Sequence, residues 1–130
     1  MTFLDSSVII DMLEGVEDAV RFVRAAKEPY LTSTICVFEV IDGKLGSGST
    51  DVDSLRQDFG GVRALELGEP VALEAARLQD ELLDDGERMA ARDLFVPATA
   101  RSTGDQLVVA DSDYRTDALE GRMTVTNLRG

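Results

Sequence analysis

The sequence predicts an α/β fold, an open parallel β-sheet flanked by helices. Short apolar runs alternate along the chain with longer segments whose apolar residues recur at helical spacing, and Gly, Pro and Asp residues separate the two kinds of segment. Strands that alternate with helices form parallel sheets, because each helix carries the chain back to the start of the next strand. Such sheets bind their ligands at the carboxyl ends of the strands.

Five short apolar runs are the expected strands. The first covers residues 2–4, and the clearest is the Gln-Leu-Val-Val-Ala run at residues 106–110. The other three cover residues 30–32, 62–67 and 123–125.

Helices are expected between these runs. The first follows Ser6 and Ser7, which are good N-caps, and ends at Gly15. The last has Asp93 as its N-cap and covers residues 94–103, with Pro97 just after its first turn. The remaining helices are expected over residues 17–27, 34–45, 51–59 and 70–85.

The size and apolar content of the chain indicate one globular domain over residues 1–130, since 44% apolar residues are enough for a single core. The first apolar run has no basic flank and is broken by Asp5 and Asp11, so we expect neither a signal peptide nor a membrane span, and a cytoplasmic location. The one cysteine, Cys36, cannot form an internal disulfide and is expected to be a buried small hydrophobe.

The chain is strongly acidic, with 25 Asp and Glu residues against 13 Lys and Arg and a net charge of −12. Such a charge repels nucleic acid at low salt, but at 1 M salt the Debye length shrinks to roughly 3 Å and long-range repulsion disappears. Because lysine is scarce, the surface resembles that of proteins from salt-accumulating microbes. Most of these carboxylates are expected to form a solvated coat.

Histidine is absent, which excludes several kinds of active site. A Ser-His-Asp triad, a Cys-His pair and an imidazole general base are impossible. Zinc is disfavoured because its usual ligands are Cys and His. Hard cations that prefer oxygen ligands remain possible.

Five acidic residues stand where the predicted sheet would bind a ligand. Asp5 ends the first strand, Asp111 and Asp113 follow residues 106–110, Asp93 begins a helix, and Glu39 lies in an otherwise apolar helical stretch. Carboxylates gathered in one place stay ionised only if a cation neutralises them, and Mg²⁺ fits that need. Bound Mg²⁺ activates water and stabilises a leaving oxygen, so this site predicts phosphodiester hydrolysis without histidine.

Four segments carrying these acids resemble, in order, the motif regions of PIN-domain ribonucleases, and most of all the VapC-type toxins of toxin–antitoxin pairs. They are FLDSSVIID at residues 3–11, FEVIDG at 38–43, RDLFVPATA at 92–100 and LVVADSDY at 107–114. The resemblance covers essentially the whole chain. It implies a single PIN-like domain with a three-layer α/β/α architecture.

By that resemblance, Asp5, Glu39, Asp93 and Asp111 are the catalytic metal ligands, with Asp113 as an auxiliary ligand. The resemblance further implies Mg²⁺ or Mn²⁺ as cofactor, RNA as substrate (tRNA being one candidate), a small antitoxin as partner and a homodimer. Ser7 would be a polar neighbour of the metal site.

The sequence departs from the family pattern at two positions without losing a carboxylate. Val109 stands where many relatives carry Thr or Ser, and Pro97 lies within the helix that follows Asp93.

Purely structural roles are the alternative for each acid. Asp5 and Asp93 are also typical helix caps, and Asp111 and Asp113 suit an ordinary turn. Glu39 can be explained by an ion pair with an arginine.

Four arginines flank the acids in the sequence and are candidates for binding RNA phosphates: Arg88, Arg92, Arg101 and Arg115. Their alternative role is pairing with surface acids.

Two other functions compete with the nuclease. An Asp-nucleophile phosphatase would use Asp5 at the end of the first strand, but Asp5-Ser6-Ser7 lacks a second acid two positions on. A catalytically inactive interaction domain of the same fold is the other alternative.

Overall fold

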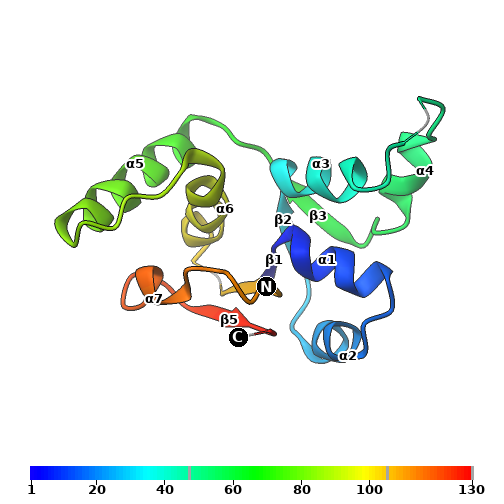
Figure 1. The fold of residues 1–130 in the computed structure, drawn as a ribbon, viewed down its shortest axis with the longest axis horizontal. Coiled ribbons are helices and arrows are strands. Elements are labelled where there is room, and N and C mark those ends of the chain that lie inside the picture. Colours follow the sequence, from blue (N-terminus) through cyan, green and yellow to red (C-terminus); the bar gives the residue numbers. More distant parts are fainter. Residues whose placement is uncertain (47, 105, 130) are drawn as a thin grey trace.

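The computed structural model describes residues 1–46, 48–104 and 106–129 (Figure 1). Its elements, in chain order, are β1 (Thr2–Leu4), α1 (Ser6–Leu13), α2 (Glu17–Ala25), β2 (Tyr30–Ser33), α3 (Thr34–Asp42), α4 (Val52–Gln57), β3 (Val62–Leu65), α5 (Glu69–Asp84), α6 (Ala91–Ser102), β4 (Leu107–Val109), α7 (Thr116–Leu119) and β5 (Val125–Asn127).

The five strands form one sheet in the order β3-β2-β1-β4-β5, and every neighbouring pair is parallel. The prediction of an open parallel sheet is therefore confirmed. After β1 the chain adds β2 and β3 on one side and then returns to add β4 and β5 on the other. The strand order thus reverses between β1 and β4, which is where open α/β sheets bind ligands.

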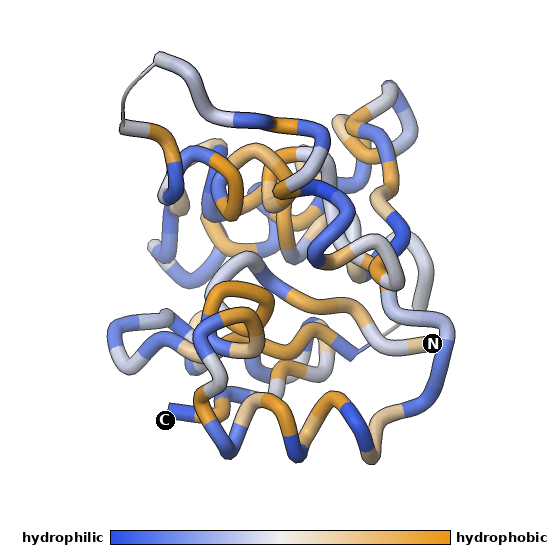
Figure 2. The backbone as a smooth tube through the Cα atoms, turned by 90° about the vertical axis from the view of Figure 1, so that its right-hand side faces the viewer, coloured by the Kyte–Doolittle hydropathy of each residue, from blue (hydrophilic) through white to orange (hydrophobic). Residues whose placement is uncertain are grey.

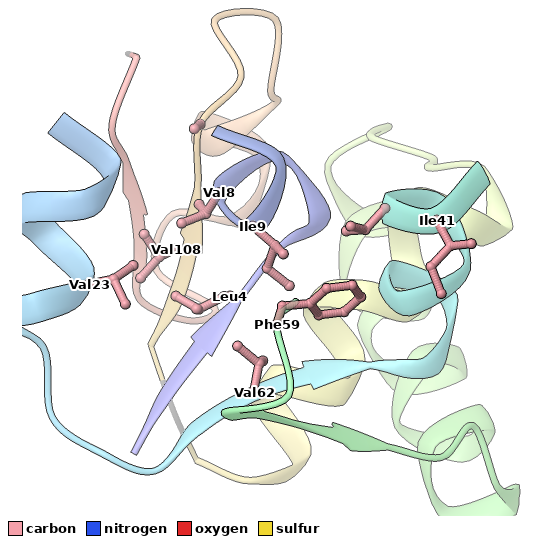
Figure 3. Close-up of a cluster of buried hydrophobic side chains, with 10 residues drawn as sticks. Leu4, Val8, Ile9, Val23, Ile41, Phe59, Val62 and Val108 are labelled. Carbon is pink, nitrogen blue, oxygen red and sulfur yellow. The ribbon is translucent and has the colours of Figure 1, made fainter. Parts of the chain in front are cut away.

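Helices cover both faces of the sheet, because successive side chains of a strand point to opposite sides. Leu4 and Val108 pack with α1, α2 and α3 on one face, where Val8, Ile9 and Val23 meet them (Figure 3). The alternate strand residues Phe3, Leu107 and Val109 pack with Val96 and Ala100 of α6 on the other face. In Figure 2 the helices alternate between hydrophobic and hydrophilic residues, and several outer loops are pale, which marks intermediate hydropathy.

Helices α5 and α6 lie next to each other at one side of the molecule (Figure 1). Apolar residues of α5, including Leu78 and Leu82, pack against Leu94 and Ala98 of α6. The pair is also joined by ion pairs: Nε of Arg101 lies 2.6 Å from Oε1 of Glu74, and its Nη2 lies 2.5 Å from Oε2 of Glu81. Arg77 adds a 3.2 Å bond to Glu74. These four residues are called the α5–α6 ion-pair network below.

Helix α6 begins earlier than the sequence predicts. Its N-cap is Ala90, so Asp93 lies in the first helical turn and does not cap the helix. The physical reason lies in the preceding loop, where the Gln79 side chain accepts a bond from the Met89 N–H and donates one to its carbonyl. This fixes the backbone just before Ala90. Pro97 is consequently deeper in the helix than expected.

Other boundaries differ by a few residues. The last strand is Val125–Asn127, where parallel pairing with β4 places it, rather than residues 123–125. The short helix α7 was not predicted, and the N-cap of α1 is Asp5 rather than a serine. The Gly- and Ser-rich stretch at residues 46–51 is expected from the sequence to form a loop, and its Ser47 lies outside the described residues. Within the described part of the chain, no helix has both the length and the apolar character needed to cross a membrane.

Candidate functional site

Asp5 lies at the carboxyl end of β1, at the point where the strand order reverses. Its Oδ2 accepts hydrogen bonds from the N–H of Ser7 at 3.1 Å and from the Ser7 hydroxyl at 2.6 Å. The Ser7 hydroxyl oxygen also accepts a 2.9 Å bond from the N–H of Ala110, directly after β4. Ser7 therefore ties Asp5 to the end of the neighbouring strand. With its side chain only 7% exposed, Asp5 is held in one position.

Glu39 reaches the same place from α3. Its Oε1 accepts a 2.9 Å hydrogen bond from the hydroxyl of Ser6, which follows Asp5. Because Glu39 lies in an apolar stretch of sequence, its carboxylate was expected to have a positively charged partner. The partner is Arg92, whose Nε donates to Oε2 of Glu39 at 2.6 Å while its Nη2 donates to Oε1. The ion-pair alternative for Glu39 is thus realised in this structure.

Arg92 also contacts the two other acids nearby. Its Nη2 lies 3.4 Å from Oδ1 of Asp5, and its Nη1 lies 3.7 Å from Oδ1 of Asp93. The hydrogen bonds to Glu39, followed by the charges of Asp5 and Glu39, raise the pKa of Arg92 against the opposing effect of burial. One guanidinium therefore faces three carboxylates. We call Asp5, Glu39, Asp93 and Arg92 the acidic cluster; its formal charge is negative.

Asp111 and Asp113 lie at the same edge of the sheet but are exposed and form a turn. Oδ1 of Asp111 accepts a 2.9 Å bond from the N–H of Asp113, and the Asp111 carbonyl accepts a 2.7 Å bond from the Asn127 amide. In the described part of the chain, none of their hydrogen bonds or ion pairs reaches the acidic cluster. The structure thus brings three of the five predicted acids together and leaves two at the rim.

Two neighbours of Asp5 were not predicted as part of the site. The buried hydroxyl of Tyr114 has no hydrogen-bond partner among the described residues. Burial, and then the charge of Asp5, raise the pKa of Tyr114, while Arg92 acts in the opposite direction. The Cys36 sulfur lies 3.9 Å from Oδ1 of Asp5, and burial raises the pKa of this thiol. The only sequence signal for Tyr114 is its place three residues after Asp111.

The flanking arginines differ in their positions. Arg92 is inside the acidic cluster, whereas Arg101 belongs to the α5–α6 ion-pair network. Arg115 pairs with Glu87 and donates a 3.0 Å bond to the carbonyl of Arg88. Arg88 and Arg115 are therefore neighbours, and both are exposed.

The acidic cluster fits a hard divalent cation in chemistry and in charge. Carboxylate oxygens are the ligands that Mg²⁺ prefers. Among the described residues, the three carboxylates of the cluster face one guanidinium, and the buried Tyr114 hydroxyl has no hydrogen-bond partner. As the side chains stand, no group of three or more Asp, Glu or Cys residues among those described is arranged to hold an ion. Arg92 contacts all three carboxylates, so an ion bound by the same oxygens would compete with its guanidinium.

Several known proteins are similar to this chain in sequence or in fold. The chain is 27% identical to Ribonuclease VapC5 of Mycobacterium tuberculosis over 132 residues, which covers 97% of this chain and 93% of that protein. Among solved structures, FitAB bound to an IR36 DNA fragment matches with a TM-score of 0.77 and 25% identity over 100% of this chain and 96% of that one.

FitAcB from Neisseria gonorrhoeae matches with a TM-score of 0.77 and 26% identity over 98% of each chain. VapBC-5, a toxin–antitoxin system from Mycobacterium tuberculosis, matches with a TM-score of 0.68 and 25% identity over 99% of this chain and 98% of that one. The sequence model of the PIN-domain family matches residues 2–118 of this chain. With the motifs, the parallel sheet and this match in agreement, the chain belongs to the PIN-domain family.

Proposed function

We propose that the protein is a ribonuclease of the VapC type that hydrolyses RNA phosphodiester bonds with Mg²⁺ or Mn²⁺. Asp5, Glu39 and Asp93 would hold the cation, and Asp111 and Asp113 would join them from the rim. The observation that carries the proposal is the excess of carboxylates over cations at the reversal point of the sheet. An excess of negative charge at the edge of the sheet where ligands bind indicates that the site takes a positively charged ligand.

Each residue of the site has a distinct part in this proposal. A bound divalent cation would lower the pKa of water and stabilise the charge of the leaving oxygen. Asp5 supplies a fixed oxygen, because Ser7 holds its other oxygen in two hydrogen bonds. Ser6 orients Glu39 by donating to its Oε1. Asp93, with more than half of its side chain exposed, is free to turn toward the cation.

RNA is supported as substrate by the family and by the name of the curated relative, a ribonuclease. Arg88, which precedes α6, and Arg115, the N-cap of α7, are exposed neighbours and would offer positive charge to the RNA. The similar structure VapBC-5, named as a toxin–antitoxin system, supports a small antitoxin as partner. We include a homodimer and a cytoplasmic location in the proposal. The protein would then be the toxin of a toxin–antitoxin pair.

The proposal is tested by incubating the purified, partner-free protein with tRNA and other total RNA in high salt, with Mg²⁺, Mn²⁺ or EDTA. Asp5→Asn is compared with Asp80→Asn, which makes the same change at an exposed position of α5. We expect metal-dependent cutting by the native protein and by Asp80→Asn, and none by Asp5→Asn. Intact RNA under every condition would favour the inactive interaction domain. Cleavage in EDTA would refute the dependence on a divalent metal.

A further inference from the structure

We propose that Arg92 is an internal counterion that the metal displaces, and that the displaced guanidinium then binds a phosphate of the RNA. This inference rests on the proposed function, because it concerns the same acidic cluster. It assigns Arg92 two positions: one on Glu39 in the metal-free protein and one on the substrate in the loaded protein.

Arg92 and a divalent cation compete for the same oxygen atoms. Arg92 binds both oxygens of Glu39 through Nε and Nη2, and the same Nη2 lies 3.4 Å from Oδ1 of Asp5. The other Asp5 oxygen is engaged by Ser7. A cation bridging Asp5 and Glu39 requires oxygens at roughly 2.0–2.1 Å for Mg²⁺, which leaves no room for a guanidinium on the same side.

Of the two groups that compete for this space, Arg92 is better able to move than Asp5. Asp5 is buried and pinned by two hydrogen bonds, whereas the Arg92 side chain is 35% exposed and extends from the first turn of α6. An arginine side chain has several freely rotating bonds, so it can leave Glu39 without a change in the backbone. The helix start keeps it at the edge of the site after it has moved.

The charges of the cluster are balanced only when both cations are present. Three carboxylates are matched by one guanidinium and one divalent cation, so the cation displaces Arg92 from its oxygens without making its positive charge superfluous. A guanidinium released beside a bound cation is well suited to a phosphate group, which it can bind through two parallel hydrogen bonds.

Arg101 provides a matched control on the same helix. It also bridges two carboxylates, Glu74 and Glu81, but Arg77 completes that network, so two arginines face two glutamates. Removing Arg101 tests the general effect of losing an arginine from α6 without touching the acidic cluster.

The first test is the affinity for Mn²⁺ alone, measured by calorimetry on the full chain without RNA. We expect Arg92→Gln to bind Mn²⁺ about tenfold more tightly than the native protein, the change that corresponds to removing one competing charge-assisted hydrogen bond. Arg92→Lys keeps the charge but loses the fork that holds Glu39, so it should also bind more tightly. Arg101→Gln should bind like the native protein, and Asp5→Asn should not bind.

The second test is the affinity for a fluorescent RNA oligonucleotide, with Ca²⁺ as the cation and with EDTA. Arg92→Gln should weaken RNA binding about tenfold in Ca²⁺ and leave it unchanged in EDTA, where Arg92 of the native protein remains on Glu39. Circular dichroism confirms that each variant is folded.

The outcomes separate this inference from the proposed function. Equal Mn²⁺ binding by the native protein and Asp5→Asn, or no binding by either, would overturn the metal site itself. If only Asp5→Asn loses Mn²⁺ while Arg92→Gln and Arg92→Lys bind no more tightly than the native protein, the metal site stands and the displacement is wrong. An RNA affinity of Arg92→Gln that equals the native value in Ca²⁺ would overturn the phosphate contact.

Discussion

Helix α6 carries two arginines that bridge carboxylates, Arg92 at its start and Arg101 near its end, and the two differ in their charge balance. Arg101 and Arg77 face Glu74 and Glu81, so the α5–α6 ion-pair network is neutral. Among the residues that the structure describes, Arg92 alone faces Asp5, Glu39 and Asp93. The geometry of the ion pairs is similar, so the excess of negative charge is what distinguishes a candidate site from a structural contact.

The positions of the two networks also differ. The α5–α6 network joins two helices at the side of the sheet, whereas the acidic cluster lies at the carboxyl end of β1 beside the reversal of strand order. A neutral network between helices is explained by stability alone. A negatively charged cluster at a ligand-binding edge costs stability, so a function is the simpler explanation for it.

The largest expected effect is on catalysis. Asp5→Asn should lower the rate of RNA cleavage by more than about a hundredfold, because it removes a fixed ligand whose cation supplies several kcal/mol of transition-state stabilisation. Glu74→Gln makes the equivalent change in the neutral network and should leave the rate unchanged. The two variants are compared by their initial rates of RNA cleavage with Mn²⁺. Equal losses of rate would show that the acidic cluster and the neutral network do not differ in function.

The next effect is on stability and its dependence on metal. Arg101→Met should lower the free energy of unfolding by about 1–2 kcal/mol, less than for a fully buried pair because these side chains are partly exposed. Arg92→Met should also destabilise the protein in EDTA, since it leaves the carboxylates without a counterion. Urea unfolding should show that Mn²⁺ rescues Arg92→Met and not Arg101→Met. Rescue of both would mean that the metal acts elsewhere.

A smaller effect is expected on RNA binding. Arg88 lies exposed before α6, and its carbonyl accepts a hydrogen bond from Arg115. Arg88→Gln should therefore reduce the slope of log affinity against log salt by about 0.7, the value for one phosphate contact on a single strand. Arg77→Gln, in the neutral network, is the control and should leave the slope unchanged. An unchanged slope for Arg88→Gln would remove Arg88 from the RNA-binding surface.

The smallest effect is the pH dependence of the neutral network. The hydrogen bond from Arg101 is the largest cause that lowers the pKa of Glu74 from its ordinary 4.5. A lowered pKa in the folded state means that this stabilisation is present above pH 4.5 and is lost as the pH falls through the folded value. The difference in unfolding free energy between the native protein and Glu74→Gln should therefore shrink below pH 4.5. A difference that stays constant would show that the charge of Glu74 does not contribute.

Much of the fold was predictable because periodicity and capping are local signals. The Thr2–Leu4 strand, the carboxylate that ends it and the order of strands and helices all follow from short stretches of sequence. The start of α6 did not, because the contact that fixes it joins Gln79 to Met89 across a loop. A local pattern cannot reveal such a bond, and Asp93 was therefore mistaken for an N-cap.

The acids of the site were predictable from the sequence, but the arginine that pairs with them was not. The sequence pointed to Asp5, Glu39 and Asp93, and the structure gathers them, but their roles as metal ligands stay predictions. Arg92 was one of four flanking arginines, and only the tertiary structure distinguishes it from Arg101, since both lie in α6 with acids nearby. Tyr114 was missed because its burial beside Asp5 depends on the packing of the chain after β4.

The displacement of Arg92 by a metal ion is tested most directly by the position of Mn²⁺ in crystals of the protein, located by its anomalous diffraction. We predict a peak within coordination distance of oxygens of Asp5 and Glu39, with the Arg92 guanidinium turned away from Glu39. The contrary result is a crystal equilibrated with saturating Mn²⁺ that shows no peak at these residues and has Arg92 still bound to Glu39. It would contradict both the metal site and the displacement of Arg92.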